Sequence, residues 1–225
     1  ATSMANVDLI KTAAASGTAP TLTYSIRDTA ANIITDAASL RAGATTLTIT
    51  DASVTGDQTV ALKGYSNFDG VYAVNDTYDE ILGAGKNVGL TAAYLNAATS
   101  VTITDTVAHL EAAGVLTAIA TATTDDALVV SDTLSNLNTS RTSGTAVAAA
   151  TSIVITDTDL DVGDVTAVNA LRALKATTYT VSDAYSDLAT AIAATGSGGA
   201  NETGVVTTFL NNAGTVKVDD NADGT

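Results

Sequence analysis

The chain contains no cysteine and no tryptophan, and its 225 residues include only one proline and one histidine. Without cysteine it can form neither a disulfide scaffold nor a zinc site of thiolate ligands. The single histidine, His109, excludes a metal site built from several histidines. Aromatic residues make up 4% of the chain, which is few for an enzyme that binds polysaccharide. The sequence also contains no convincing nucleophile–base pair. We therefore expect no enzyme.

Basic residues are also scarce, with 9 Lys and Arg against 24 Asp and Glu and a formal net charge of −15. A nucleic-acid-binding protein needs clustered basic residues to displace counterions, so that class is excluded. No apolar run approaches the roughly 20 residues of a membrane-spanning helix. The hydrophobic fraction of 46% is too high for a disordered acidic tail. The sequence therefore predicts a folded acidic chain with no nucleic-acid partner and no membrane span.

One pattern recurs through the chain: apolar, any, apolar, polar, aspartate, then usually threonine or alanine. We number the two apolar positions 1 and 3 and the aspartate 5. A degenerate eighth copy ends at Asp220, and the intervals between successive aspartates are 23, 25, 29, 27, 25, 26 and 37 residues. We call the aspartates of the seven clear copies the junction aspartates: Asp28, Asp51, Asp76, Asp105, Asp132, Asp157 and Asp183.

The periodicity of the chain changes at each junction aspartate. Before it, apolar and polar residues alternate, which predicts a short strand with one buried face. After it, apolar residues recur at helical spacing, as in Ile33, Ala37 and Leu40. The same spacing relates Val107, Leu110, Ala113 and Thr117, and also Val168, Leu171 and Leu174. Ile or Leu stands five residues after most junction aspartates, whereas two copies have Gly56 and Val162 there.

A junction aspartate is well placed to be the N-cap of the helix that follows it. Its carboxylate can accept hydrogen bonds from the free N–H groups of the first turn, and its charge suits the positive end of the helix dipole. If the strands stack in register, the carboxylates form a row about 4.8 Å apart. Such a row could also collect calcium, but Ca²⁺ needs six to eight oxygens at one point, so capping is favoured.

Repetition of a strand and a helix predicts an α/β fold, a right-handed βα solenoid with parallel strands and about eight repeats of roughly 25 residues. Residues 1–20 would be a partial N-terminal repeat or cap, 21–194 the solenoid, and 195–225 a Gly-rich insertion with a divergent C-terminal unit. The unfinished ends suggest a piece of a longer protein, ends covered by neighbouring subunits, or drifted caps. Tyrosine heads alternate copies, which leaves open whether alternate strands lie in one sheet or two.

The copies of the form Tyr-x-apolar-x-Asp-Thr-x-x-Asn-apolar and apolar-Thr-Ile-Thr-Asp-Thr cover roughly residues 21–190. They resemble the Ala/Thr-rich YxVxDTxxNL and TITDT repeats of large secreted bacterial surface proteins, notably the adhesin-like and surface-layer proteins of cyanobacteria, and repeats of some virion surface proteins. The resemblance implies a scaffold and carries over no catalytic residue.

Two further patterns suggest binding. Asp219, Asn221 and Asp223, followed by glycine, match the first half of a calcium-binding loop, although an acidic turn can have this composition by chance. Calcium is therefore the one cofactor that we consider. Outward strand residues form pairs that could order water or pack on another protein surface, but solvated strand threonine is the favoured interpretation: Thr48 and Thr50, Thr102 and Thr104, Thr180 and Ser182.

Together these patterns favour an extracellular or cell-surface structural protein that forms a surface layer, filament or adhesin by packing as a homo-oligomer or polymer. The alternatives are a calcium-dependent or glycan-binding adhesion module with a cell-surface glycan as partner, and a virion decoration or fibre protein. The tyrosines at position 1, Tyr24, Tyr72 and Tyr179, are expected in the core rather than on a sugar-stacking platform.

Overall fold

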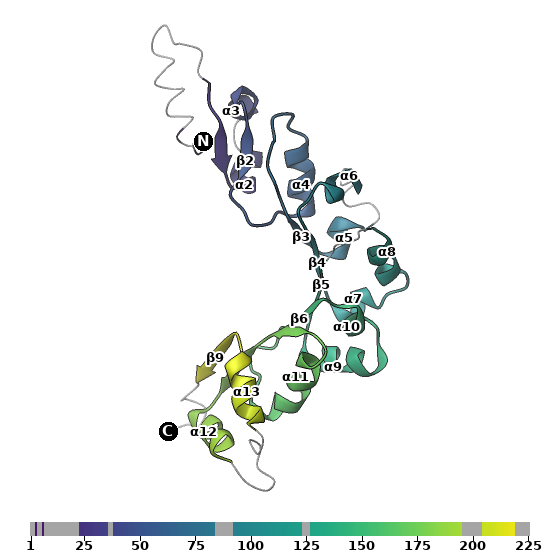
Figure 1. Cartoon of the computed structure of the whole chain (residues 1–225), viewed down its shortest axis with the longest axis vertical. Helices are drawn as coiled ribbons and strands as arrows, with labels where there is room; N and C mark the ends of the chain where they lie inside the picture. The colour runs from purple at the N-terminus through teal and green to yellow at the C-terminus, as the bar shows by residue number, and fades with distance from the viewer. Residues whose placement is uncertain are drawn as a thin grey trace. The chain divides into compact units, whose positions relative to one another are not determined.

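The computed structural model describes residues 3, 6, 23–35, 38–83, 92–122, 127–194 and 204–218. The chain divides into two compact units, one of Ala1–Ile103 with Ala118–Asp126, the other of Thr104–Thr117 with Ala127–Thr225. Each unit is built from short strands and short helices (Figure 1). In chain order the elements are β1 (Ile26–Asp28), α2 (Ala30–Thr35), α3 (Ala38–Gly43), β2 (Leu47–Ile49), α4 (Gly56–Lys63), β3 (Val74–Asp76), α5 (Tyr78–Ile81), α6 (Ala92–Asn96), β4 (Val101–Asp105), α7 (Val107–Leu110), α8 (Val115–Ala122), β5 (Ala127–Asp132), α9 (Leu134–Ser143), α10 (Ala146–Ala149), β6 (Ser152–Ile155), η1 (Val162–Asp164), α11 (Val165–Arg172), β7 (Ala176–Thr178), β8 (Thr180–Asp183), α12 (Tyr185–Ala193), α13 (Val205–Asn212) and β9 (Thr215–Val218).

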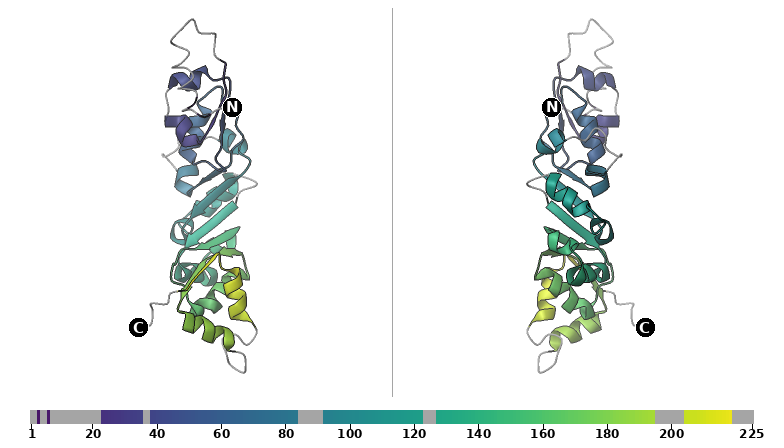
Figure 2. Two further views of the ribbon diagram at one scale, coloured as in Figure 1. Left: turned by 90° about the vertical axis from the view of Figure 1, so that its left-hand side faces the viewer. Right: turned by 90° about the vertical axis from the view of Figure 1, so that its right-hand side faces the viewer.

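The strands pair in parallel, which confirms the predicted α/β class with parallel strands. Among the described residues they form one sheet of β1 and β2, one of order β3-β4-β5-β6-β7, and one of β8 and β9. Strands β3 to β6 belong to consecutive motif copies, so alternate copies are not separated into different sheets. Figure 2 shows the strands of the second unit stacked side by side.

The core is formed by motif positions 1 and 3, as the alternation predicts. Leu128, Val130, Ile153 and Ile155 are all at most 5% exposed, whereas the residues between them on the strands are partly exposed. Helices α7, α9 and α10 lie on one side of β5 and β6 in the second unit (Figure 1) and cover this apolar side of the strands.

Three predicted helices differ from expectation. In the first, α2 ends at Thr35 and α3 begins at Ala38, while Ala37 lies outside the described residues. The predicted helix from Val107 through Thr117 is two helices, α7 and α8, because Gly114 between them has a φ of 88° that no right-handed helix contains. In the third, Val168 and Leu171 are fully buried on α11, but Leu174 lies beyond its end and is 56% exposed.

The register of the strands also differs from the row of aligned aspartates that we expected. In four pairs of neighbouring motif strands the register is shifted by two residues, so that the aspartate of one strand lies opposite position 3 of the next. Asp28 is opposite Ile49, Asp76 is opposite Ile103, and Asp132 is opposite Ile155. A shift of two keeps every side chain on its own face of the sheet. The junction aspartates are therefore staggered rather than opposite one another.

Candidate functional site

The junction aspartates are the candidate site that recurs through the structure. Because each strand is shifted by two residues, the aspartate of one copy lies beside the first turn of the helix that follows the preceding strand. In the first unit, Asp51 Oδ2 accepts a hydrogen bond from Ala30 N–H at 2.6 Å, and Asp76 Oδ2 accepts one from Gly56 N–H at 3.0 Å. Each carboxylate thus connects two consecutive motif copies.

The second unit repeats this geometry three times. The Oδ2 atoms of Asp132, Asp157 and Asp183 accept hydrogen bonds at 3.0, 2.5 and 3.0 Å. The donors are the N–H groups of Val107, Leu134 and Val162, the first residues of α7, α9 and η1. All three bonds span more than 20 residues of sequence, from strand end to helix start.

The aspartate is not the N-cap of its own helix, which corrects the sequence prediction. The N-cap of α5, α7 and α9 is the threonine that follows the aspartate: Thr77, Thr106 and Thr133. Their hydroxyls accept hydrogen bonds from the N–H of the residue three positions on, at 3.4 Å each. The aspartate's other oxygen, Oδ1, holds the N–H of that threonine at 2.8 to 2.9 Å. Because of this register, the carboxylate accepts a hydrogen bond from the start of the preceding helix, and the threonine caps the helix that follows the aspartate.

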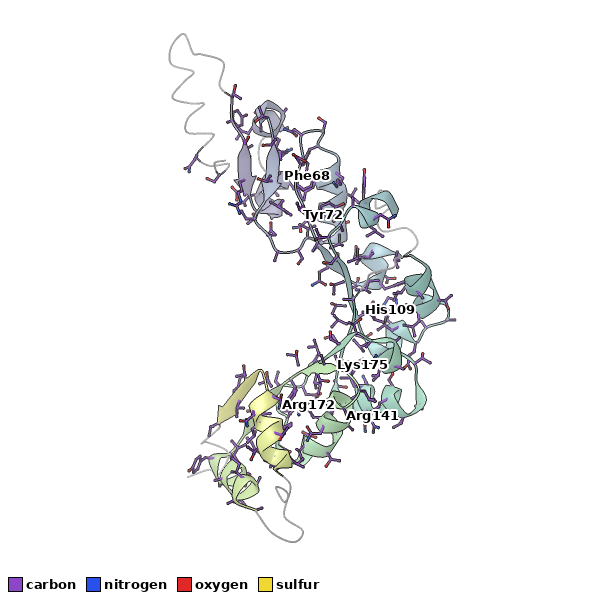
Figure 3. The ribbon with its side chains drawn as sticks, viewed as in Figure 1. Phe68, Tyr72, His109, Arg141, Arg172 and Lys175 are labelled. Atoms are coloured by element: carbon purple, nitrogen blue, oxygen red, sulfur yellow. The ribbon has the colours of Figure 1, made fainter. Side chains whose placement is uncertain are left out.

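A polar side chain four residues after the aspartate completes several junctions. The Nδ2 groups of Asn32 and Asn136 donate to Oδ1 of Asp28 and Asp132, at 2.8 Å each. In the Asp105 copy this position is His109, whose Nδ1 lies 2.8 Å from Asp105 Oδ2 (Figure 3). This asparagine is part of the recurring sequence pattern, but its role at the junction was not predicted. Its signal was the constant spacing from the aspartate.

Gly56 and Val162, the two exceptions in the sequence pattern, are first residues of helices. Both follow their aspartate by five residues, because the chain adds one more strand contact before the helix begins. Val54 forms a parallel bridge with Val74, and Leu160 forms one with Val181. The N-cap then falls at Thr55, which makes a capping box with Gln58, and at Asp161 in the other copy.

The tyrosines at position 1 join strand starts to the helices that follow. Tyr72 and Tyr179 are 3% and 2% exposed, as expected for core residues. The hydroxyls of Tyr24, Tyr72 and Tyr179 donate to the backbone carbonyls of Leu40, Tyr94 and Phe209, at 2.7, 2.5 and 2.5 Å. Burial raises the pKa of Tyr72 and Tyr179, since an ionised phenolate would lose its hydration.

Glu111 forms a separate hydrogen-bond network in the second unit that no sequence pattern indicated. Its Oε1 accepts hydrogen bonds from the hydroxyl of Ser140 at 2.5 Å and from the N–H groups of Thr145 and Ala146 at 3.0 and 3.2 Å. These donors lower the pKa of Glu111, with the Ser140 hydroxyl the largest cause. The side chain of Glu111 thus supplies the acceptor that α10 lacks, because the N-cap Thr145 makes no side-chain cap.

The junctions are poorly suited to calcium. Both oxygens of Asp76, Asp132 and Asp183 face backbone N–H groups, whose positive ends a cation would have to displace. Within the described ranges, no group of three or more His, Cys, Asp or Glu side chains is arranged to hold a metal ion. Asp219, Asn221 and Asp223, the predicted calcium ligands, lie outside the described residues.

An open polar cavity of about 400 Å³ lies in the second unit, beside the start of α9. Its lining includes Asp157, Asp159, Asp164, Ser135 and Asn138. The carboxylate of Asp157 accepts a hydrogen bond from the N–H of Leu134, so it is already part of a junction.

No helix in the part of the chain that the structure describes is long and apolar enough to cross a membrane. Comparison of the chain with protein-family models, curated proteins and solved structures finds no match.

Proposed function

We propose that the protein is an extracellular structural repeat protein, a right-handed βα solenoid that forms a surface layer, filament or adhesin by the packing of subunits. The observation that carries this proposal is the junction, in which one set of contacts joins a motif copy to the copy before it. The carboxylate-to-helix bond recurs at Asp51, Asp76, Asp132, Asp157 and Asp183. Contacts between neighbouring copies are what stabilise a repeat protein, so recurring side chains that make them are typical of a structural scaffold.

The exposure of β9 also supports assembly. At positions 1 and 3 of this strand, Val216 and Val218 are 40% and 52% exposed, whereas Val101 and Ile103 at the same positions of β4 are 4% and 0% exposed. In the described residues β9 pairs only with β8. An exposed apolar strand with a free edge favours the addition of another strand.

The charge of the chain is consistent with a protein that stays soluble until it assembles. A net charge of −15 keeps separate subunits apart, and divalent cations would weaken this repulsion in an assembled lattice. Contacts of a head-to-tail kind lead to filaments, and self-complementary contacts lead to closed pairs.

The test is to measure the mass of the purified protein by light scattering and to image it by electron microscopy, with calcium and with a chelator. We expect concentration-dependent oligomers or ordered polymers. A monomer under both conditions would contradict the proposal and favour a binding module, which glycan arrays would then examine. The variant Val216→Glu/Val218→Glu separates assembly through β9 from assembly through another surface.

A further inference from the structure

The second unit carries opposite charges at the two ends of its strands. The strands are parallel, so their C-terminal ends all lie on one side of the unit. Each helix begins on that side, shortly after a strand, and runs back toward the side where the next strand begins. Residues at the starts of the helices therefore gather on one side, and residues at the ends of the helices gather on the other.

We call these two surfaces the acidic rim and the basic rim. The acidic rim consists of the carboxylates around the starts of η1, α11 and α12: Asp159, Asp161, Asp164 and Asp187. The basic rim consists of the cations at the ends of α9 and α11 and just before β7, labelled in Figure 3: Arg141, Arg172 and Lys175. Helix dipoles favour this distribution, because the start of a helix is positive and its end is negative.

The charges of the two rims are not neutralised within the unit. All seven side chains are exposed or half-exposed, and none of them forms an ion pair with another described residue. Arg141 donates from Nε to the amide oxygen of Asn138, at 3.0 Å. Arg172 donates in the same way to Asn169, at 2.8 Å. These acceptors are neutral, so three cations on one side and four carboxylates on the other remain available to a partner.

We propose that the basic rim of one copy of this chain packs against the acidic rim of a second copy, with the strands of both copies pointing in the same direction. Complementary charge across an interface fixes the orientation of the partners and disfavours wrong ones. A second copy matches both rims at once, whereas a polycation or a polyanion would match only one. The contact leaves one rim of each copy free, so it can repeat and build a row of subunits. This inference rests on the proposed function and specifies its side-to-side contact.

The experiment measures self-association by sedimentation of the full chain over a range of concentrations. The basic-rim variant is Arg172→Glu/Lys175→Glu, and the acidic-rim variant is Asp159→Lys/Asp187→Lys. The control is Arg27→Glu, which reverses the charge of an exposed residue in the middle of β1. We expect each rim variant to raise the dissociation constant of self-association by at least about tenfold, and the control to leave it within about twofold. Circular dichroism checks that each variant is folded.

A second measurement mixes the two rim variants, because their exchanged charges are complementary again. The mixture should associate where each variant alone does not, a result that a misfolded variant could not give. Both variants keep a net negative charge, since that of the wild type is −15, so general attraction between the chains would not explain it.

Two outcomes would overturn the inference while the proposed function stands: association that the rim variants leave unchanged, or a mixture that associates no better than its components. A wild-type chain that is monomeric at every concentration would contradict both the inference and the proposed function.

Discussion

Asp132 accepts a hydrogen bond through Oδ2 from the backbone N–H of Val107, which lies 25 residues earlier in the chain, at 3.0 Å. The carboxylate is 9% exposed and also holds Thr133 N–H and Asn136 Nδ2 through Oδ1. One side chain thus satisfies donors from two consecutive motif copies. The link between copies is a buried carboxylate and not only the pairing of strands.

Asp132→Asn should lower the free energy of unfolding by about 1–3 kcal/mol, because asparagine offers one acceptor oxygen where the structure uses two. A donor of the amide would then face the N–H of Val107 or Thr133. Asp159→Asn, at an exposed position of the same unit, is the control and should change the free energy by less than about 0.5 kcal/mol. Denaturant unfolding measures both, and equal effects would contradict the junction geometry.

His109→Asn should leave stability close to that of the wild type, because asparagine at this position donates to the junction aspartate in the Asp132 copy. His109→Leu should cost about 0.5–1.5 kcal/mol through loss of the donor to Asp105. Thermal unfolding of the two variants gives the comparison. If leucine and asparagine behave alike, the side chain at this position does not support the aspartate.

Tyr179→Phe removes only the hydroxyl that donates to the carbonyl of Phe209, since the ring stacks on Phe209 with centroids 5.3 Å apart. We expect a loss of about 1 kcal/mol. Tyr185→Phe is the matched control, because Tyr185 is 68% exposed. Denaturant titrations near neutral pH should show a shift in midpoint for the first variant alone.

The same tyrosine predicts a loss of stability in alkali. Burial raises the pKa of Tyr179 above the usual value of 10.0, so the folded state keeps its proton where the unfolded chain releases it. The stabilisation is complete below the unfolded pKa and is lost as the pH rises through the folded pKa. The difference between the wild type and Tyr179→Phe should therefore narrow above about pH 10, as measured by unfolding at stepped pH. A difference that stays constant with pH would argue that the hydroxyl is solvated.

Glu111 predicts the opposite dependence in acid. The Ser140 hydroxyl and the N–H groups of Ala146 and Thr145 lower its pKa in the folded state. The stabilisation is present above the unfolded pKa of about 4.5 and is lost as the pH falls through the folded value. Glu111→Gln should be less stable than the wild type at pH 7, and the difference should shrink in acid. A double-mutant cycle with Ser140→Ala measures the coupling, expected at about 1 kcal/mol because Glu111 is exposed.

The parallel α/β class and the buried positions 1 and 3 could be predicted because both depend on local alternation. The break at Gly114 was missed because the spacing of Leu110 and Ala113 fits one helix equally well. The roles of the N-cap threonines and of Asn136 were missed because the aspartate was the more obvious cap and the register was unknown. Glu111 left no periodic signal, since it contacts a helix start 34 and 35 residues later that no local pattern connects with it.

By itself the amino-acid sequence determined which strand positions are apolar, and that an aspartate stands where each alternating strand pattern gives way to helical spacing. Those features follow from interactions among residues a few positions apart. Only the tertiary structure decided which helix each carboxylate serves. A two-residue shift between parallel strands is a choice among registers that all bury the same side chains, and this shift places Asp51 beside Ala30 rather than beside Asp28.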